Sequence, residues 1–161
     1  MSLDPTSIID PQLRRLYDYW AGKRDAKGKL PARADLDPAE IPALLPYVML
    51  LDISHDPLDF KVRLAGTDIC RRFGEEVTGK MLRQIDLDGE TEHIFAQYAE
   101  AATSGQPRLD VQEFQRNDGR YMHYYRVILP LAADGTHVDM LLTGQRAIGI
   151  DGYPCKPMRL L

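Results

Sequence analysis

An alternating pattern of apolar and polar residues near the end of the chain most constrains its fold. From Leu109 onward apolar residues recur at every second position, and two turn sequences interrupt the pattern, at Asn117-Asp118-Gly119 and at Asp134-Gly135. Period-two alternation is typical of strands that bury one face, and an Asp-Gly pair between two such runs is a strong hairpin signal. The segment therefore predicts three consecutive antiparallel strands ending at about Ala147.

Two further strands are predicted earlier in the chain. Residues 47–53 form a short apolar run, and in residues 59–65 Phe60, Val62 and Leu64 alternate with polar side chains. The turn-rich residues 54–58 lie between the two runs. We expect an antiparallel hairpin with its apolar side chains on one buried face.

Helical patterns precede and separate these strands. Asp10-Pro11 is a helix start signal, because Asp can cap the helix and Pro is favoured at its first position. Apolar side chains then follow at helical spacing, predicting an amphipathic helix over residues 11–21. These side chains are Leu13, Leu16, Tyr17 and Trp20. A longer helix is predicted over residues 90–103, and short helical pieces over residues 37–46.

Two groups of hairpin-connected strands separated by helices specify an α+β domain. We expect a five-stranded antiparallel sheet with helices on one face and an extra N-terminal amphipathic helix. The chain has 161 residues, which suffice for one packed core but not for two ordinary domains. We divide it into an N-terminal tail (1–10), a single domain (11–147) and a C-terminal tail (148–161).

Several short motifs occur in an order that resembles a known family. They are Leu16-Tyr17-Asp18-Tyr19-Trp20, Leu36-Asp37-Pro38-Ala39-Glu40-Ile41-Pro42, Arg63-Leu64-Ala65-Gly66-Thr67, Phe73-Gly74 with Thr78-Gly79-Lys80, and Leu129-Pro130-Leu131. With the predicted order of elements, they make the chain similar to the PAS superfamily, in its divergent single-domain branch of alphaproteobacterial type (PAS family 5). The resemblance implies a PAS-like sheet and a sensory or scaffolding module of signal transduction. No room for an output domain remains after Ala147, so we expect a stand-alone module that acts through protein–protein contact.

The resemblance also implies two candidate sites. PAS folds hold small ligands between the sheet and the central helices, and alternation suggests the candidate lining Phe73, Tyr98, Tyr125, Met140 and Leu142. The same side chains could instead simply fill a core. The N-terminal helix could cover its own sheet or that of a second copy in a homodimer, so Leu13, Leu16, Tyr17 and Trp20 are the candidate interface.

The residues argue against the cofactors of better-known PAS sensors. Cys70-Arg71-Arg72-Phe73 has an extra residue relative to the flavin-reactive motif of the light sensors, and it precedes the helix that carries the reactive cysteine there. Among the histidines, His93 lies nearest to the region of a haem ligand, but its neighbours indicate a solvent-facing first turn. The four histidines have no ligand spacing, so no metal site is expected.

Composition excludes other classes of function. The formal net charge is −4, which gives no field for attracting phosphate backbones, so nucleic-acid binding is not expected. The chain has only two cysteines, no signal peptide and no apolar run that could span a membrane, and we expect it in the cytoplasm. No catalytic motif is present; an enzyme whose groups converge only in the fold, or a nucleotide-responsive binding protein, remains the alternative. The sequence does not identify a ligand, a partner or a pathway.

Overall fold

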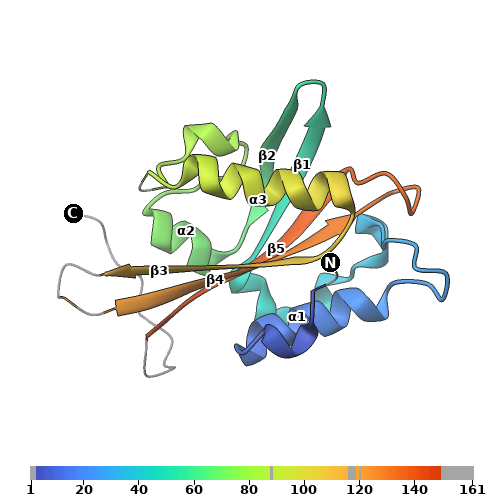
Figure 1. Ribbon diagram of the computed structural model, residues 1–161, viewed down its shortest axis with the longest axis horizontal. Helices are drawn as coiled ribbons and strands as arrows, with labels where there is room; N and C mark the ends of the chain where they lie inside the picture. Colours follow the sequence, from blue (N-terminus) through green and yellow to red (C-terminus); the bar gives the residue numbers. More distant parts are fainter. Residues whose placement is uncertain (1–2, 88, 116–118, 120, 150–161) are drawn as a thin grey trace.

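The computed structural model describes residues 3–87, 89–115, 119 and 121–149, and confirms the predicted five-stranded antiparallel sheet (Figure 1). The helices are α1 (Pro11–Gly22), α2 (Thr67–Phe73) and α3 (Thr91–Ser104), and the strands are β1 (Val48–His55), β2 (Leu58–Ala65), β3 (Arg108–Gln115), β4 (Tyr121–Leu131) and β5 (Met140–Gly149). Short 3-10 helices occur at Pro5–Ser7, Arg33–Asp35, Pro38–Glu40, Pro42–Tyr47 and Leu82–Gln84. Across the described ranges, no helix has both the length and the apolar character needed to cross a bilayer.

The sheet has the strand order β2-β1-β5-β4-β3, and every neighbouring pair is antiparallel. The two groups of strands meet where β1 pairs with β5, with Val48 opposite Gly144 and Leu51 opposite Leu141. The edge strands are therefore β2 and β3. Because α2 and α3 connect these two edges, the chain must cross the sheet between them, and the two helices cover one of its faces.

A bulge in the first hairpin changes one predicted side chain. The register between β1 and β2 shifts between Leu50 and Leu51, so Leu50 lies opposite Leu64 and Leu51 lies opposite Val62. Phe60 and Val62 are fully buried as expected, whereas Leu64 is 46% exposed. The prediction for Leu64 was wrong because an inserted residue reverses the face of the positions that follow it.

Helices cover both faces of the sheet (Figure 1). We call the face beneath α3 the inner face. There Phe60 of β2 packs edge-on against two rings of α3, with centroid separations of 5.1 Å to Phe95 and 5.6 Å to Tyr98. The opposite, outer face is covered in part by α1, which is the extra N-terminal helix that the sequence predicts.

A glycine of β5 allows α1 to approach the outer face closely. A Cβ atom at Gly144 would lie 2.6 Å from a methyl carbon of Leu16 and 2.8 Å from one of Leu13. A Cβ atom essentially never lies this close to another non-bonded carbon, so any larger residue at this position would require Leu13 and Leu16 to move.

Polar contacts fix both ends of α1. At its start, Asp10 accepts a hydrogen bond from the Leu13 amide (3.0 Å) and pairs with Arg146 Nε of β5 (3.3 Å). At its end, Trp20 Nε1 donates to the carbonyl oxygen of Pro130 in β4 (2.9 Å). The helix is thus tied to the sheet by hydrogen bonds as well as by apolar burial.

Two element ends differ from the prediction. Strand β5 ends at Gly149 rather than at Ala147, because its last two residues still pair with β4. Helix α1 ends at Gly22, one residue later than predicted. The rest of the predicted C-terminal tail, residues 150–161, and the turn residues 117–118 lie outside the described part of the chain.

Candidate functional site

Polar side chains lie in a line across the inner face of the sheet, where apolar packing is the rule. Asp110 of β3 lies directly opposite Arg126 of β4, which in turn lies opposite Gln145 of β5. All three are almost completely buried. We call these residues the polar row. Strand register alone places them side by side, since directly paired residues of neighbouring strands share a face.

Arg126 and Asp110 form a buried ion pair in the polar row. Arg126 Nη1 donates to Asp110 Oδ2 over 2.6 Å, and the two side chains are only 3% and 5% exposed. The other carboxylate oxygen, Oδ1, lies 2.9 Å from Nε2 of His93 on α3. Burial alone would lower the pKa of Arg126, but the fields of Tyr98, Tyr124 and Asp110 raise this pKa above its ordinary value. The guanidinium group therefore stays charged inside the fold.

Two tyrosines connect the polar row to its surroundings. Gln145 Nε2 donates to Thr143 Oγ1 (3.1 Å) and lies 3.5 Å from the hydroxyl oxygen of Tyr98 on α3. The hydroxyl of Tyr124 donates to Gln145 Oε1. Burial raises the pKa of Tyr98 to about 12, so its phenol keeps its proton at neutral pH.

A second arginine approaches the polar row from α2. The guanidinium carbon of Arg72 lies 4.5 Å from the ring centroid of Tyr124, and that of Arg126 lies 4.9 Å from the same centroid. Arg72 Nη2 is paired with Asp68 at 2.9 Å. Within the described ranges, however, Arg72 Nη1 and Arg126 Nε are shielded from solvent and have no hydrogen-bond partner. Two donors beside one ring thus lack an acceptor among the residues that the structure describes.

The residues predicted to line a cavity separate onto the two sides of the sheet. Tyr98 lies on the inner face, and Phe73 is half-buried on α2. Tyr125, Met140 and Leu142 lie on the outer face, because they alternate in step with Gly144 and Val127, which lie against α1. The five therefore do not line one cavity. Whether Tyr98 and Phe73 contact a ligand stays a prediction.

The candidate interface residues are mainly buried within their own chain. Leu13 and Leu16 are 1% exposed and Trp20 is fully buried against the sheet, while Tyr17 is half-buried. Of the two alternatives for α1, the structure has the helix covering its own sheet. Leu13, Leu16 and Trp20 are therefore covered in the single chain, and whether these residues also form an interface with a second copy stays a prediction.

The other singled-out side chains form no reactive group. Cys70 Sγ lies 3.4 Å from Glu76 Oε1, and burial raises the pKa of its thiol, which favours the unreactive protonated form. His123 packs edge-on against Tyr125 in the sheet, as its position in the strand predicts. No group of three or more His, Cys, Asp or Glu side chains within the described ranges could hold a metal ion.

His93 and Asp110 resemble part of an acid–base site, because a carboxylate can orient a histidine. Nevertheless, within residues 3–87, 89–115, 119 and 121–149, neither side chain is hydrogen-bonded to a hydroxyl or thiol group that could act as a nucleophile. Asp110 is instead shared with Arg126. Asp110 thus bridges His93 on α3 and Arg126 on β4.

Sequence reasoning missed the polar row. A signal was present, because Arg126 stands between Tyr125 and Val127 in a strand that is otherwise largely apolar. A charge at such a position indicates a buried partner. Only the strand pairing identifies that partner as Asp110.

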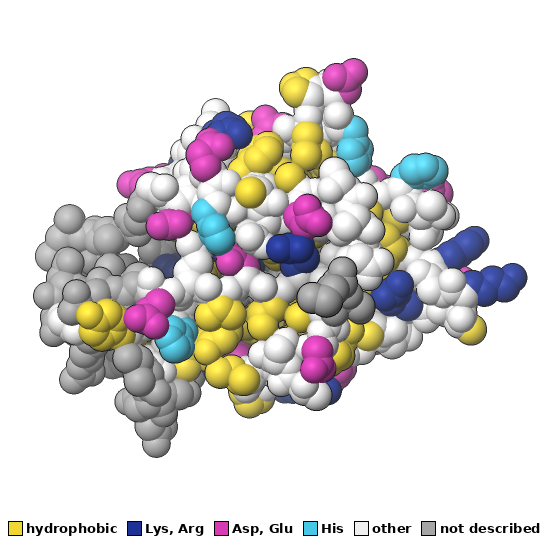
Figure 2. All heavy atoms as spheres, viewed as in Figure 1, with side chains coloured by type: hydrophobic (Ala, Val, Ile, Leu, Met, Phe, Trp, Pro, Cys, Tyr) yellow, Lys and Arg dark blue, Asp and Glu magenta, His cyan; other side chains and the backbone are white. Residues whose placement is uncertain are grey.

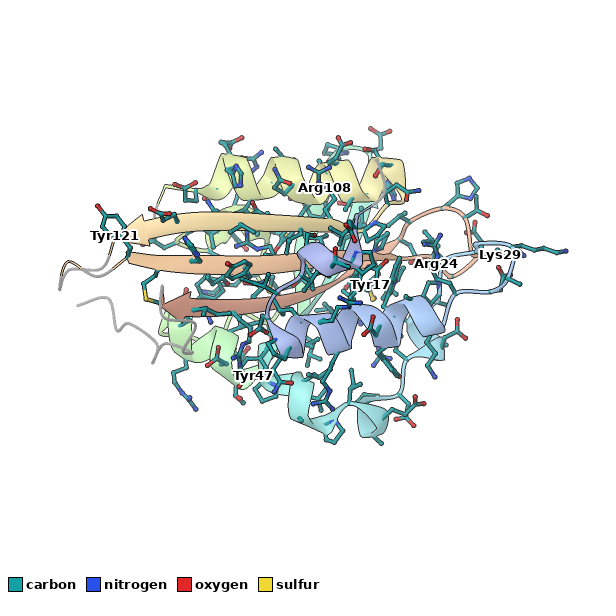
Figure 3. The ribbon with its side chains drawn as sticks, turned by 60° about the horizontal axis from the view of Figure 1, so that its bottom comes forward. Tyr17, Arg24, Lys29, Tyr47, Arg108 and Tyr121 are labelled. Atoms are coloured by element: carbon teal, nitrogen blue, oxygen red, sulfur yellow. The ribbon has the colours of Figure 1, made fainter. Side chains whose placement is uncertain are left out.

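A hollow of about 260 Å³ lies apart from the polar row, between the loop after α1 and the β4–β5 turn. Lys29 borders it and projects from this end of the molecule in Figure 3. Its walls also carry Lys23, Asp25 and Asp134. Because both signs of charge are present, the hollow favours no charged ligand.

Comparisons with known proteins show the family of this chain and support its fold. A family model described as a PAS domain matches residues 9–145. Among solved structures, the Rhodobacter sphaeroides LOV protein superposes with a TM-score of 0.50 at 18% identity, covering 73% of this chain and 71% of that chain. A PAS domain of a protein from Colwellia psychrerythraea gives a TM-score of 0.48 at 13% identity, covering 70% of this chain and 98% of that chain. A search of curated protein sequences found no match.

Proposed function

Since the chain belongs to the PAS domain family, we propose that it is a sensory module of signal transduction that acts through protein–protein contact and holds a small ligand on the inner face of its sheet. It carries out no catalytic step in this proposal. The ligand would bind beside the polar row, and the contact would form between outer faces of two copies.

The polar row is the observation that carries the proposal. Burying an ion pair costs free energy, and an apolar core of the same volume would often be as stable or more stable. Arg126 and Asp110 are nonetheless buried beneath α3, with free guanidinium donors beside Tyr124. A binding role accounts for such an arrangement better than a purely structural one.

The uncovered part of the outer face supports the contact. Hydrophobic side chains gather along the lower side of β3 in Figure 2, and Val111 of this strand is 47% exposed. Tyr121, equally exposed, lies at the far end of β4, beyond the reach of α1 (Figure 3). An apolar patch on the free edge strand of a sheet is suited to pairing with a second copy.

Native mass spectrometry of the purified protein, beside a denaturing spectrum, tests both parts. We expect a dimer with excess mass that is lost on denaturation. Val111→Asp should give monomers, whereas Leu64→Asp, at an equally exposed position on the opposite edge strand, should leave the dimer intact. A wild-type monomer without excess mass would contradict the proposal.

A further inference from the structure

We propose that Arg72 and Arg126 together bind the carboxylate group of a small organic acid beside Tyr124. The inference rests on the proposed function, because it names the chemical class of the ligand on the inner face. It assigns a role to two arginines from separate elements, α2 and β4, that lie against one ring.

The unfilled donors of the two guanidinium groups carry the inference. Arg72 Nη1 and Arg126 Nε have no hydrogen-bond partner in the described part of the chain, and both atoms are inaccessible to solvent. A buried donor without a partner is destabilising, so native proteins rarely retain one without a function. An arginine presents its donors in a rigid planar fork that matches carboxylate geometry. A carboxylate beside Tyr124 would supply the acceptor that each of these donors lacks among the described residues.

The surrounding charges favour a singly charged acid. Each arginine already has one carboxylate partner, Asp68 for Arg72 and Asp110 for Arg126, so the four formal charges cancel. A second negative charge on the ligand would meet no further cation in this set, and its desolvation would be costly. A monocarboxylate therefore fits better than a phosphate dianion.

The neighbouring side chains favour an apolar body on the acid. The ring of Tyr124 is buried beside both arginines, and the ring centroid of the buried Tyr98 lies 5.9 Å from the guanidinium carbon of Arg126. Ile69 is the only buried residue of α2. Since α3 has four buried residues, a ligand on the side of α2 would disturb less packing than one beneath α3.

Titration with benzoate, hexanoate and acetate tests the assignment, with benzamide and inorganic phosphate as comparisons. Isothermal calorimetry gives the affinities, and the ¹H–¹⁵N signal of Arg126 Nε reports the site. We expect benzoate or hexanoate to shift this signal and to bind at least about tenfold more tightly than benzamide, the neutral analogue. Phosphate should bind more weakly than both benzoate and hexanoate.

Matched variants of α2 show which side chain is responsible. Arg72→Met should weaken carboxylate binding by about tenfold or more, whereas Arg71→Met, at an exposed position of the same helix, should not. Arg72→Lys keeps the charge but loses the planar fork, and should recover only part of the affinity. Circular dichroism confirms that each variant is folded.

The proposal is overturned if none of the carboxylates shifts the Arg126 Nε signal, or if benzamide or phosphate binds as tightly as benzoate and hexanoate do. It is also overturned if Arg72→Met and Arg71→Met bind the carboxylates with the same affinity. A neutral molecule in the native mass spectrum, retained by Arg72→Met, would overturn the carboxylate assignment and leave the sensory function standing. A ligand-free monomer would overturn both.

Discussion

Removing Asp110 should reveal how strongly the buried cation depends on its partner. In Asp110→Ala the Arg126 guanidinium, 3% exposed, would lose its only carboxylate within the described ranges. Breaking a buried pair in this way costs about 3–5 kcal/mol, because an uncompensated charge stays inside the fold. Domains of this kind have a total stability of about 5–15 kcal/mol, so the loss is a large share of it. For a chain of this length, each kcal/mol lowers Tm by about 2–4 °C.

A double-mutant cycle separates the charge from the packing. Arg126→Met with Asp110→Leu replaces both partners by apolar side chains, and should lie much closer to the wild type than Asp110→Ala does. His93→Ala removes the second contact of the carboxylate from a side chain that is 42% exposed, and should cost less than about 1 kcal/mol.

The cycle consists of the wild type, the single variants Arg126→Met and Asp110→Leu, and the double variant. Urea denaturation of these four proteins, and of Asp110→Ala and His93→Ala beside them, gives the free energies of unfolding, provided that the slopes with urea agree. A loss below about 1 kcal/mol in Asp110→Ala would refute the reasoning, because the cation would then have found water or another partner. Additive effects in the cycle would also refute it, since the pair would not be coupled.

Two further predictions concern packing and pH. Gly144→Ala should lower the free energy of unfolding by about 1–3 kcal/mol, because Leu13 and Leu16 must move. Gly66→Ala should lower it by more than about 3 kcal/mol, because the new Cβ would lie 2.2 Å from a backbone oxygen. Equal losses in urea denaturation would contradict this order. Above pH 10 the unfolded chain loses the Tyr98 proton, while the folded chain holds it up to about pH 12, so the free energy of unfolding falls between these pH values by up to about 3 kcal/mol. Tyr98→Phe should show a smaller fall over the same range. Identical pH profiles of the two proteins would contradict the burial of a protonated phenol.

Local signals predicted the elements well, because each depends on residues close in sequence. Asp10 and Pro11 identify the start of α1, and the period-two pattern identifies the strands of the second group. The assignment of faces could not be predicted in the same way. Alternation along a strand shows that Tyr125 and Leu142 lie on the opposite face of the sheet from the residues next to them in sequence. Only the packing of α1 on Gly144 shows that this face is the outer one.

The candidate site was harder to predict because long-range pairing creates it. Asp110, Arg126 and Gln145 come from three strands and are polar residues that sequence patterns assign to no core. The contact of Arg72 with Tyr124 is harder still to predict, because it depends on where α2 lies over the sheet.

The polar row also explains why the sheet has one register. A slip of β3 by one residue against β4 would carry Asp110 to the outer face and bring Val111 beneath α3, leaving Arg126 buried without its carboxylate. The cost of that unpaired cation, about 3–5 kcal/mol, opposes the slip even where apolar burial would tolerate it. The pairing that holds the Arg126 guanidinium beside Tyr124 therefore also aligns the edge strand. A variant that loses the ion pair should lose strand order at β3 before it loses the packing of α1 on the far face.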